Sequence, residues 1–315
     1  MAEVELRELR YFRVVAEELN FSRAAIRLGM TQPPLSRAIR LLERRLDTAL
    51  FERDSHRVAL TAAGEVLLAE SRSVLDAADA AVRRTRRAAA GPPTLVVTAK
   101  PCVATDLLRD LVAAYRALPA APMVEVVVGG FGEQADMVRD GRADAALLSA
   151  PYDVQGLELE HLMGEPRVAA LPRVHPLAAR ETLTCADFAD LPMPRWPTAS
   201  VVERDYWAGR DRAPNRAGER ARGPLVHDNA QVLECVALEQ AVALVSASLA
   251  DRNPRPDIVY RPVSDASPFT IAIAWRQGAR NPWLARLVDV ATKVAAETEA
   301  RGLDMGAGLP VGRHG

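Results

Sequence analysis

The feature that most restricts the fold is a pair of adjacent prolines, Pro33 and Pro34, within the stretch FSRAAIRLGMTQPPLSRAIRLLERRL at residues 21–46. Proline breaks a helix interior, but it fits the first turn, where backbone N–H groups have no intrahelical acceptor and its fixed φ is already helical. The prolines therefore predict a sharp corner followed by a new helix. Since proline disfavours α geometry in the residue before it, Gln32 is the expected hinge.

The segments on both sides of this corner follow helical spacing. A first helix of about 14 residues is predicted from Leu6 to Leu19. Ser22 is the predicted N-cap of a short second helix, which Gly29 ends with a left-handed residue. The third helix buries an apolar stripe of Leu35, Ile39, Leu42 and Leu46 and turns arginines outward. A short helix, a glycine turn and an arginine-bearing helix predict a helix-turn-helix.

A hairpin and a long helix follow. Residues 50–53 and 57–60 bracket a short polar turn, which predicts a small wing. Thr61 is the predicted cap of an alanine-rich helix that ends near Ala90, and about 28 helical residues reach about 42 Å. This length exceeds what the head can cover, so we expect the helix to pair with a second copy of the chain. The expected dimer stripe consists of Leu67, Val74, Ala78 and Val82.

After the GPP tripeptide at residues 91–93 the apolar pattern changes to short strands. Strands are predicted at 94–98, 124–128 and 143–148, with helices at 104–118 and 133–139 between them. This βαβαβ order implies a parallel sheet with ligand space at the strand ends. A second set has strands at 167–171, 225–227, 242–245 and 258–262 and helices near 185–189 and 231–239. A strand at 269–275 and a helix from Pro282 to about Ala296 close the chain.

Charge is distributed unevenly along the chain. The net charge is −1, but residues 21–60 contain eight arginines against four acidic residues. A basic head on a mildly acidic body is typical of a chain with one segment that faces a polyanion. Three scattered cysteines give neither a disulfide framework nor a metal-binding spacing. Because no apolar run approaches the roughly 18 residues of a membrane span, the expected compartment is the cytoplasm, without a membrane partner.

The chain resembles the LysR-type transcriptional regulators over nearly its full length. The resemblance rests on LRELRYFRVVAEELNFSRAAIRLGMTQPPLSRAIRLLERRLDTALFER and VALTAAGEVLL in the head, and on GRADAAL, HPLA, ECVALEQAVALVSASLA and IVYRP in the body. It implies a winged helix-turn-helix, a dimerising linker helix and an effector domain built like a periplasmic binding protein. It also implies a homotetramer that activates or represses transcription in response to a small molecule.

The expected fold is thus α+β in the head and α/β in the body. The expected domains are a DNA-binding domain at 1–61, a linker helix at 62–91 and an effector domain at 92–300, followed by a disordered tail at 301–315. Within the effector domain, subdomain I is expected at about 92–163 and 267–300, and subdomain II at about 164–266.

The expected DNA-binding residues lie at the third helix and on the wing. Glutamine can read adenine, and arginine can read guanine or hold phosphate. The expected set is Ser22, Arg23, Thr31, Gln32, Pro33, Pro34, Ser36, Arg37, Arg40, Arg53, His56 and Arg57. A solvated helix face and a charged hairpin tip are the alternatives for these residues.

Lys100 is the most informative residue of the expected effector site, because the chain contains only two lysines, Lys100 and Lys293. It follows the first strand of the body, where many family members carry a small hydroxyl residue. A lysine there predicts an anionic group on the effector, although a surface lysine is the alternative. The full expected set is Thr98, Lys100, Cys102, Thr105, Gly130, Phe131, Trp196, His227 and Asn229.

Two other classes of function are weaker alternatives. A redox sensor would use Cys102, but no resolving cysteine lies near it in sequence. An enzyme would need a convergent nucleophile and base, and no GxSxG, HExxH or Walker motif is present. We therefore expect no enzymatic activity, no cofactor and no metal. The expected partners are double-stranded DNA, a small-molecule effector and further copies of the chain as a homodimer or homotetramer, with RNA polymerase as a further candidate.

Overall fold

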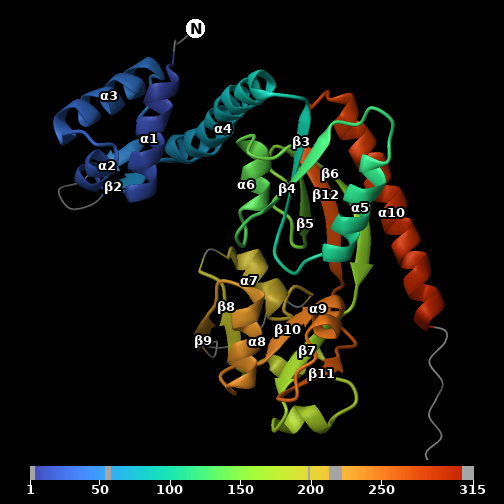
Figure 1. Ribbon diagram of the computed structural model, residues 1–315. Helices are drawn as coiled ribbons and strands as arrows, with labels where there is room; N and C mark the ends of the chain where they lie inside the picture. Colours follow the sequence, from blue (N-terminus) through green and yellow to red (C-terminus); the bar gives the residue numbers. More distant parts are fainter. Residues whose placement is uncertain (1–3, 54–57, 198, 213–221, 307–315) are drawn as a thin grey trace, which may run out of the picture. The chain divides into compact units, whose positions relative to one another are not determined.

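The computed structural model describes residues 4–53, 58–197, 199–212 and 222–306 (Figure 1). The chain forms two compact units. The first contains residues 1–90 and 139–142, and the second contains residues 91–138 and 143–315.

The first unit begins with three helices around one core. They are α1 (Leu6–Glu18), α2 (Phe21–Arg27) and α3 (Gln32–Arg45). The rings of Phe12 and Phe21 both contact Phe51, with centroids 5.4 and 5.8 Å from that ring. Glu8 is buried and receives a hydrogen bond of 2.8 Å from Arg45 at the end of α3. Aromatic packing and this ion pair fix the angle between α1 and α3.

The corner between α2 and α3 matches the prediction except in its caps. Asn20, not Ser22, caps α2, because its side chain accepts hydrogen bonds from the backbone N–H of residues 22 and 23. Gly29 has φ +66°, the left-handed conformation that was expected. The two prolines lie in the first turn of α3, but Gln32 is already helical and Thr31 is the N-cap. The hinge therefore lies one residue earlier than predicted.

The wing and the long helix are both present. Strands β1 (Phe51–Arg53) and β2 (Val58–Leu60) pair antiparallel, with residues 54–57 outside the described part of the chain. The Thr61 hydroxyl accepts a hydrogen bond of 3.0 Å from Gly64 N–H and caps α4 (Ala62–Ala90), which has 29 residues. A Cβ at Gly64 would lie 2.2 Å from the Leu50 carbonyl oxygen. Only glycine allows the wing to approach α4 this closely.

Helix α4 packs on α1, and this contact involves some of the α4 residues that were expected to form the dimer interface. Leu67 is half-buried and contacts the core of the three-helix head. Leu75 is buried, and Asp79 pairs with Arg10 of α1 at 3.1 Å. Val74 and Val82 remain exposed, by 43% and 49% of their side chains. Exposed apolar side chains of the expected dimer stripe therefore remain on α4.

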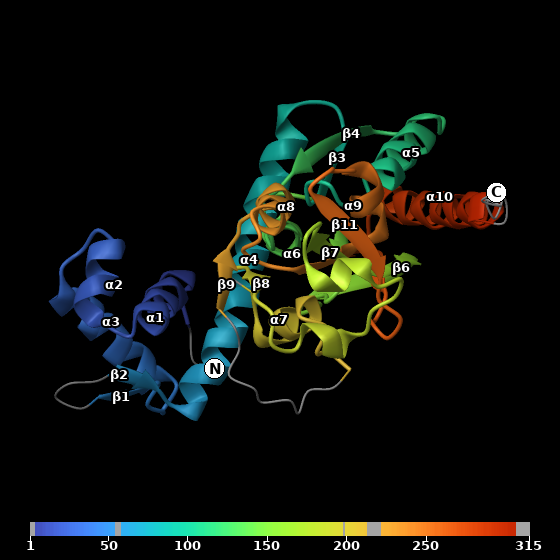
Figure 2. The same ribbon diagram turned by 90° about the horizontal axis from the view of Figure 1, so that it is seen from below.

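The second unit contains a five-stranded sheet in the order β4-β3-β5-β12-β6 (Figures 1 and 2). Its strands are β3 (Thr94–Ala99), β4 (Met123–Val128), β5 (Ala145–Ser149), β6 (Leu157–Glu165) and β12 (Phe269–Arg276). β3 pairs parallel with β4 and β5, as predicted, whereas β12 pairs antiparallel with β5 and β6. Helices α5 (Thr105–Arg116) and α10 (Pro282–Gly306) cover one face, and α6 (Gln134–Arg139) covers the other.

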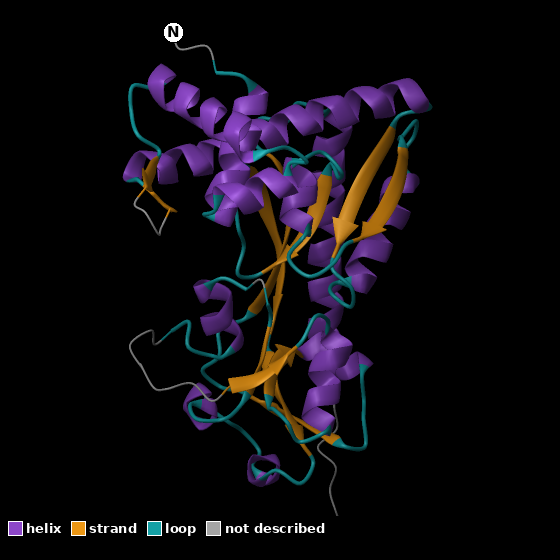
Figure 3. Ribbon diagram, turned by 90° about the vertical axis from the view of Figure 1, so that its left-hand side faces the viewer, coloured by secondary structure: helices purple, strands orange, loops and turns teal. Residues whose placement is uncertain are grey.

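A smaller sheet in the order β10-β7-β11 lies in the same unit (Figure 3). Both of its strand pairs are antiparallel, so the parallel arrangement does not extend to it. Its strands are β7 (Arg167–Pro172), β10 (Ala243–Ser246) and β11 (Ile258–Pro262). The other elements of this part of the chain are short helices at Pro176–Ala179 and Cys185–Phe188, strands β8 (Met193–Arg195) and β9 (Arg222–Leu225), and helices α7 (Val201–Trp207), α8 (Asn229–Ala237) and α9 (Ala247–Arg252).

The chain passes between the two sheets twice, at Pro166 and again between β11 and β12. Arg167 lies at the first passage, and its side chain is fully buried. Its guanidinium donates 2.6 Å hydrogen bonds to the carbonyl and the hydroxyl of Ser267 in the second passage. It also donates to Asp211 at 3.1 Å and to the carbonyl of Tyr206. One buried cation thus joins both connections and the end of α7.

Several elements differ from the sequence-based prediction. Strands β6 and β8, helices α7 and α9 and the short helix at Pro176–Ala179 were not predicted. The strand expected at 225–227 is β9, which ends at Leu225. Helix α10 continues to Gly306, so residues 301–306 are helical rather than disordered, and residues 307–315 lie outside the described chain. No helix within the described ranges is long and apolar enough to cross a membrane.

Candidate functional sites

The first candidate site is the exposed face of α3. Arg37 and Arg40 are exposed, and neither guanidinium has a hydrogen-bond or ion-pair partner within the described ranges. At the start of the helix the Ser22 hydroxyl donates a hydrogen bond of 3.1 Å to the Gln32 side chain. Pro33 is exposed, while Pro34 and Ser36 are half-buried. The face presents two free cations and a fixed glutamine amide, which suits the grooves and phosphates of DNA.

The other expected DNA-binding residues are placed differently. Arg23 donates a hydrogen bond of 2.6 Å to the Glu18 carbonyl and pairs with the Glu18 carboxylate at 3.3 Å, so its charge is partly neutralised within the protein. Thr31 is exposed, and its hydroxyl makes no capping bond to α3. Arg53 ends β1 on the wing. His56 and Arg57 lie outside the described residues.

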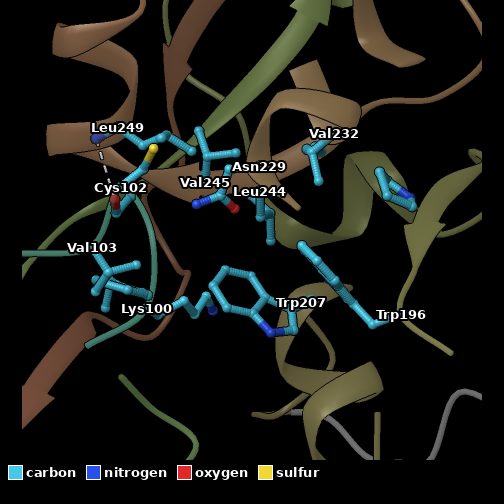
Figure 4. A pocket seen from close by; sticks show the side chains of 14 residues that line it. Lys100, Cys102, Val103, Trp196, Trp207, Asn229, Val232, Leu244, Val245 and Leu249 are labelled. Atoms are coloured by element: carbon cyan, nitrogen blue, oxygen red, sulfur yellow. Dashed lines mark hydrogen bonds between the residues drawn. The ribbon is translucent and has the colours of Figure 1, made fainter. Parts of the chain in front are cut away.

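The second candidate site is a pocket in the second unit, lined by residues that follow strands of both sheets (Figure 4). Two small cavities, of about 30 and 80 Å³, adjoin Lys100 on different sides. The first is lined mainly by apolar side chains with the Asn229 amide among them, and the second includes Tyr152 and Glu203. Cavities of this size hold a few water molecules, so a larger ligand needs the walls to move apart.

Lys100 occupies the centre of an aromatic cage. Its Nζ lies 3.9 Å from the ring centroid of Phe131, 5.5 Å from that of Trp207 and 5.8 Å from that of Trp196. Phe131 and Trp196 stack with their centroids 3.8 Å apart and an angle of 9° between the planes. Figure 4 shows the Lys100 side chain extending toward Trp207. Within the described chain this ammonium has no hydrogen bond or ion pair, so ring faces are its main neighbours.

Burial changes the acidity of Lys100. Removal of water from the amine lowers its pKa from 10.5 to about 7, while the negative charge of Glu203 acts in the opposite direction. The pocket thus contains a cation that readily gives up its proton and that lacks a fixed counter-ion.

Four of the other expected effector residues lie in the pocket and four do not. Cys102, Phe131, Trp196 and Asn229 line its cavities. Thr98 is fully buried on the other side of the sheet, where its hydroxyl contacts the Met137 sulfur at 3.4 Å. Strand alternation explains this, because the side chain of residue 98 points to the α6 face. Thr105, Gly130 and His227 line neither of the two cavities described beside Lys100.

Trp207 and Glu203 were missed by the sequence analysis. Both lie on α7, which begins with a capping box in which the Ser200 hydroxyl accepts from Glu203 N–H and the Glu203 carboxylate accepts from Ser200 N–H. Serine followed three residues later by glutamate is a recognised start signal for a helix. The motif SVVE at residues 200–203 therefore could have revealed α7 and placed an indole one turn further along.

A wider groove adjoins the second cavity, and its lining is acidic. It has a volume of about 580 Å³, and its lining includes Glu133, Asp136, Asp153 and Glu203. No basic side chain lines it among the described residues. Asp153 and Glu203 line both this groove and the second cavity beside Lys100.

The three cysteines are free thiols. Burial raises the pKa of Cys185 to about 12 and also raises the pKa of Cys235, so neither favours a reactive thiolate. Cys102 is exposed beside the pocket. The described residues contain no cluster of three or more His, Cys, Asp or Glu side chains that could hold a metal ion.

Comparisons with known proteins agree with this arrangement. A sequence profile described as bacterial regulatory helix-turn-helix protein, lysR family, matches residues 6–65, and one described as LysR substrate binding domain matches residues 88–296. The Hca operon transcriptional activator HcaR of Escherichia coli is 29% identical over 94% of this chain and all of its own length. The transcriptional regulator BudR of Raoultella terrigena is 32% identical over 91% of this chain and all of its own length.

Solved structures resemble the fold of the whole chain. Full-length BenM superposes with a TM-score of 0.52 and 26% identity, covering 94% of this chain and 98% of that one. CbnR, described as a LysR family transcriptional regulator, superposes with a TM-score of 0.54 and 25% identity over 93% of this chain and 99% of that one. Both the head and the two-sheet unit thus have counterparts in solved structures.

Proposed function

The chain belongs to the LysR family of DNA-binding transcriptional regulators, and from this premise we propose that it reads operator DNA through α3 and responds to an anionic effector at Lys100. The observation that carries the proposal is the pairing of two unpartnered cationic sites, one on the exposed face of a recognition helix and one in an aromatic cage. Each site lacks a counter-ion within the described chain. A DNA phosphate or base edge would supply a partner for the first, and an effector carboxylate or phosphate for the second.

The DNA half of the proposal is tested by Arg37→Ala. Losing a guanidinium that contacts phosphate or guanine is expected to weaken operator binding by about 1–3 kcal/mol, and loss of a phosphate contact lowers the salt slope by about 1. Arg286→Ala is the matched control, because Arg286 is an exposed arginine on α10. Binding is measured by fluorescence anisotropy over a range of salt. Equal affinity and equal salt slope in the two variants would contradict the role of α3.

The effector half is tested by a thermal-shift screen with small carboxylates and phosphates. The strongest ligand is then titrated into wild type and Lys100→Met. Loss of one charge-assisted contact is expected to weaken binding by about 1.5–3 kcal/mol, or about 10- to 150-fold. Asn229 is the polar side chain beside Lys100 that can donate a second hydrogen bond to the anion. A strongest ligand that is neutral, or that binds Lys100→Met equally well, would refute the anionic effector.

Assembly and location follow from the same proposal. Val74, Ala78 and Val82 recur every four residues along α4 and offer an apolar strip to a second copy, and two dimers would make a homotetramer. RNA polymerase is the proposed contact for activation, and the cytoplasm is the proposed location because the DNA is there. We propose no enzymatic activity, because the relatives are named as regulators and the pocket residues have a binding role.

A further inference from the structure

Lys100 has three features that a lysine does not need if it only forms an ion pair with an anionic ligand. Its Nζ lies near three aromatic rings, it has no acidic partner at ion-pair distance within the described residues, and the half-buried residue adjoins two small cavities. The enclosure removes water from the amine. A lysine in a desolvated apolar pocket is the form in which this side chain acts as a nucleophile toward carbonyl compounds.

The acidity of the amine agrees with this geometry. Its pKa of about 7 means that about half of the side chains are unprotonated at pH 7. An ordinary exposed lysine has a pKa near 10.4, so its unprotonated fraction at pH 7 is smaller by about a thousandfold. The titratable groups that line the two cavities beside Lys100 are Glu203 on α7, Tyr152 and Asp153 after β5, and Cys102. Of these, Glu203 lowers the free-amine fraction without restoring the ordinary value.

We propose that Lys100 is a carbonyl-reactive amine and that its ligand class is a small 2-oxo acid or aldehyde, which it holds as an imine. This deepens the proposed effector site and rests on it. The Nζ lone pair attacks the carbonyl carbon and forms a carbinolamine. Loss of one water molecule, containing the carbonyl oxygen and both amine hydrogens, leaves a C=N bond. No oxidant or reductant takes part.

The residues around Lys100 suit each stage of this condensation. Protonation of the imine restores a cation between the rings of Phe131 and Trp207, so the cage keeps a favourable occupant. The carboxylate of a 2-oxo acid would then lie beside that cation, within the cavity that also presents the Asn229 amide. Glu203 lines the cavity on the other side and is the proposed group that takes a proton from the carbinolamine nitrogen and passes it to the departing oxygen. The cavities of about 30 and 80 Å³ favour ligands with few heavy atoms.

The chain offers a direct test because Lys293 is its only other lysine. The full-length protein is incubated with pyruvate or glyoxylate and sodium cyanoborohydride, which reduces an imine to a stable secondary amine. Labelling is then mapped by mass spectrometry. Lys293 is exposed and serves as the internal control within the same molecule. Because a less basic amine is also a weaker nucleophile, we expect Lys100 to be labelled about tenfold or more faster than Lys293 at pH 7, rather than a thousandfold.

Lys100→Arg keeps a cation in the cage but cannot form this imine, so among the lysines only Lys293 is expected to be labelled, and mapping separates this labelling from that of the α-amine. Circular dichroism of this variant checks that it folds. Equal labelling of Lys100 and Lys293 in wild type would overturn the imine. The imine and the anionic effector site can fail separately. If Lys100 forms no imine but a carboxylate without a carbonyl group binds there and changes operator affinity, the proposed regulator and its anionic effector site still hold.

Discussion

Replacing Lys100 by methionine should make the folded protein more stable near neutral pH, and the gain should disappear at high pH. The pKa of this lysine falls from 10.5 to about 7 on folding because the amine loses its water. At 1.36 kcal/mol for each pH unit, this corresponds to at most about 5 kcal/mol of destabilisation. Methionine has a similar length and no charge, so it can occupy the space between Phe131 and Trp207 without that cost.

The sign of the pH dependence follows from proton binding. Below pH 7 the lysine is protonated in both the folded and the unfolded state, and the folded state bears the full cost. Between pH 7 and 10.5 the unfolded chain holds the proton while the folded chain has lost it. The stability of wild type relative to Lys100→Met therefore rises with pH across this window, by up to about 1.4 kcal/mol per pH unit. Above pH 10.5 both states are neutral and the difference vanishes.

Urea denaturation of wild type, Lys100→Met and Lys293→Met from about pH 6 to pH 10 measures this dependence. Lys293 is exposed, so its substitution controls for the loss of one positive charge. Taking the difference between variants cancels the titration of every group that they share. Parallel stability curves for wild type and Lys100→Met over this range would show that the cage does not desolvate the amine, and the reasoning about Lys100 would fail.

Three further predictions concern the first unit. Asn20→Ala should destabilise the protein by about 1 kcal/mol because it removes the cap of α2, whereas Ser22→Ala should cost less than half of that; equal costs in urea denaturation would contradict the capping assignment. Gly64→Ala should cost about 1–3 kcal/mol, because its Cβ would meet the Leu50 carbonyl at 2.2 Å, and an unchanged melting temperature would contradict it. Val74→Glu should turn dimers into monomers in sedimentation velocity, while an unaltered sedimentation coefficient would exclude this face of α4.

The head could be predicted almost residue by residue because local signals determine it. Two prolines, one left-handed glycine and a 3.6-residue apolar stripe leave little choice of conformation between α2 and α3. The cap of α2 was assigned wrongly because asparagine and serine stand two positions apart and both are good caps. Only the backbone conformation of Asn20, φ −154° and ψ 113°, decides between them.

The pocket was predicted less well because it is formed by residues distant in sequence. Lys100 and Phe131 follow neighbouring parallel strands, so strand order alone placed them together. Trp207 enters from α7, more than a hundred residues later in the chain, and only the passage between the two sheets brings its ring to Lys100. Strand β6 was missed although LELE alternates at its start, because its pairing partner β12 is also far away in sequence.

The buried Arg167 has a mechanical consequence for the pocket. It ties the Tyr206 carbonyl to both passages between the sheets, and Trp207 is the next residue along α7. Trp196 has no such tie and instead rests on Phe131. If the two halves of this unit rotate about the passages, Trp207 stays near the axis while Trp196 travels with the moving half. Such a rotation moves the pocket wall formed by Trp196 relative to the wall formed by Trp207. The distance that the Trp196 indole moves then sets the length of the ligand that fits.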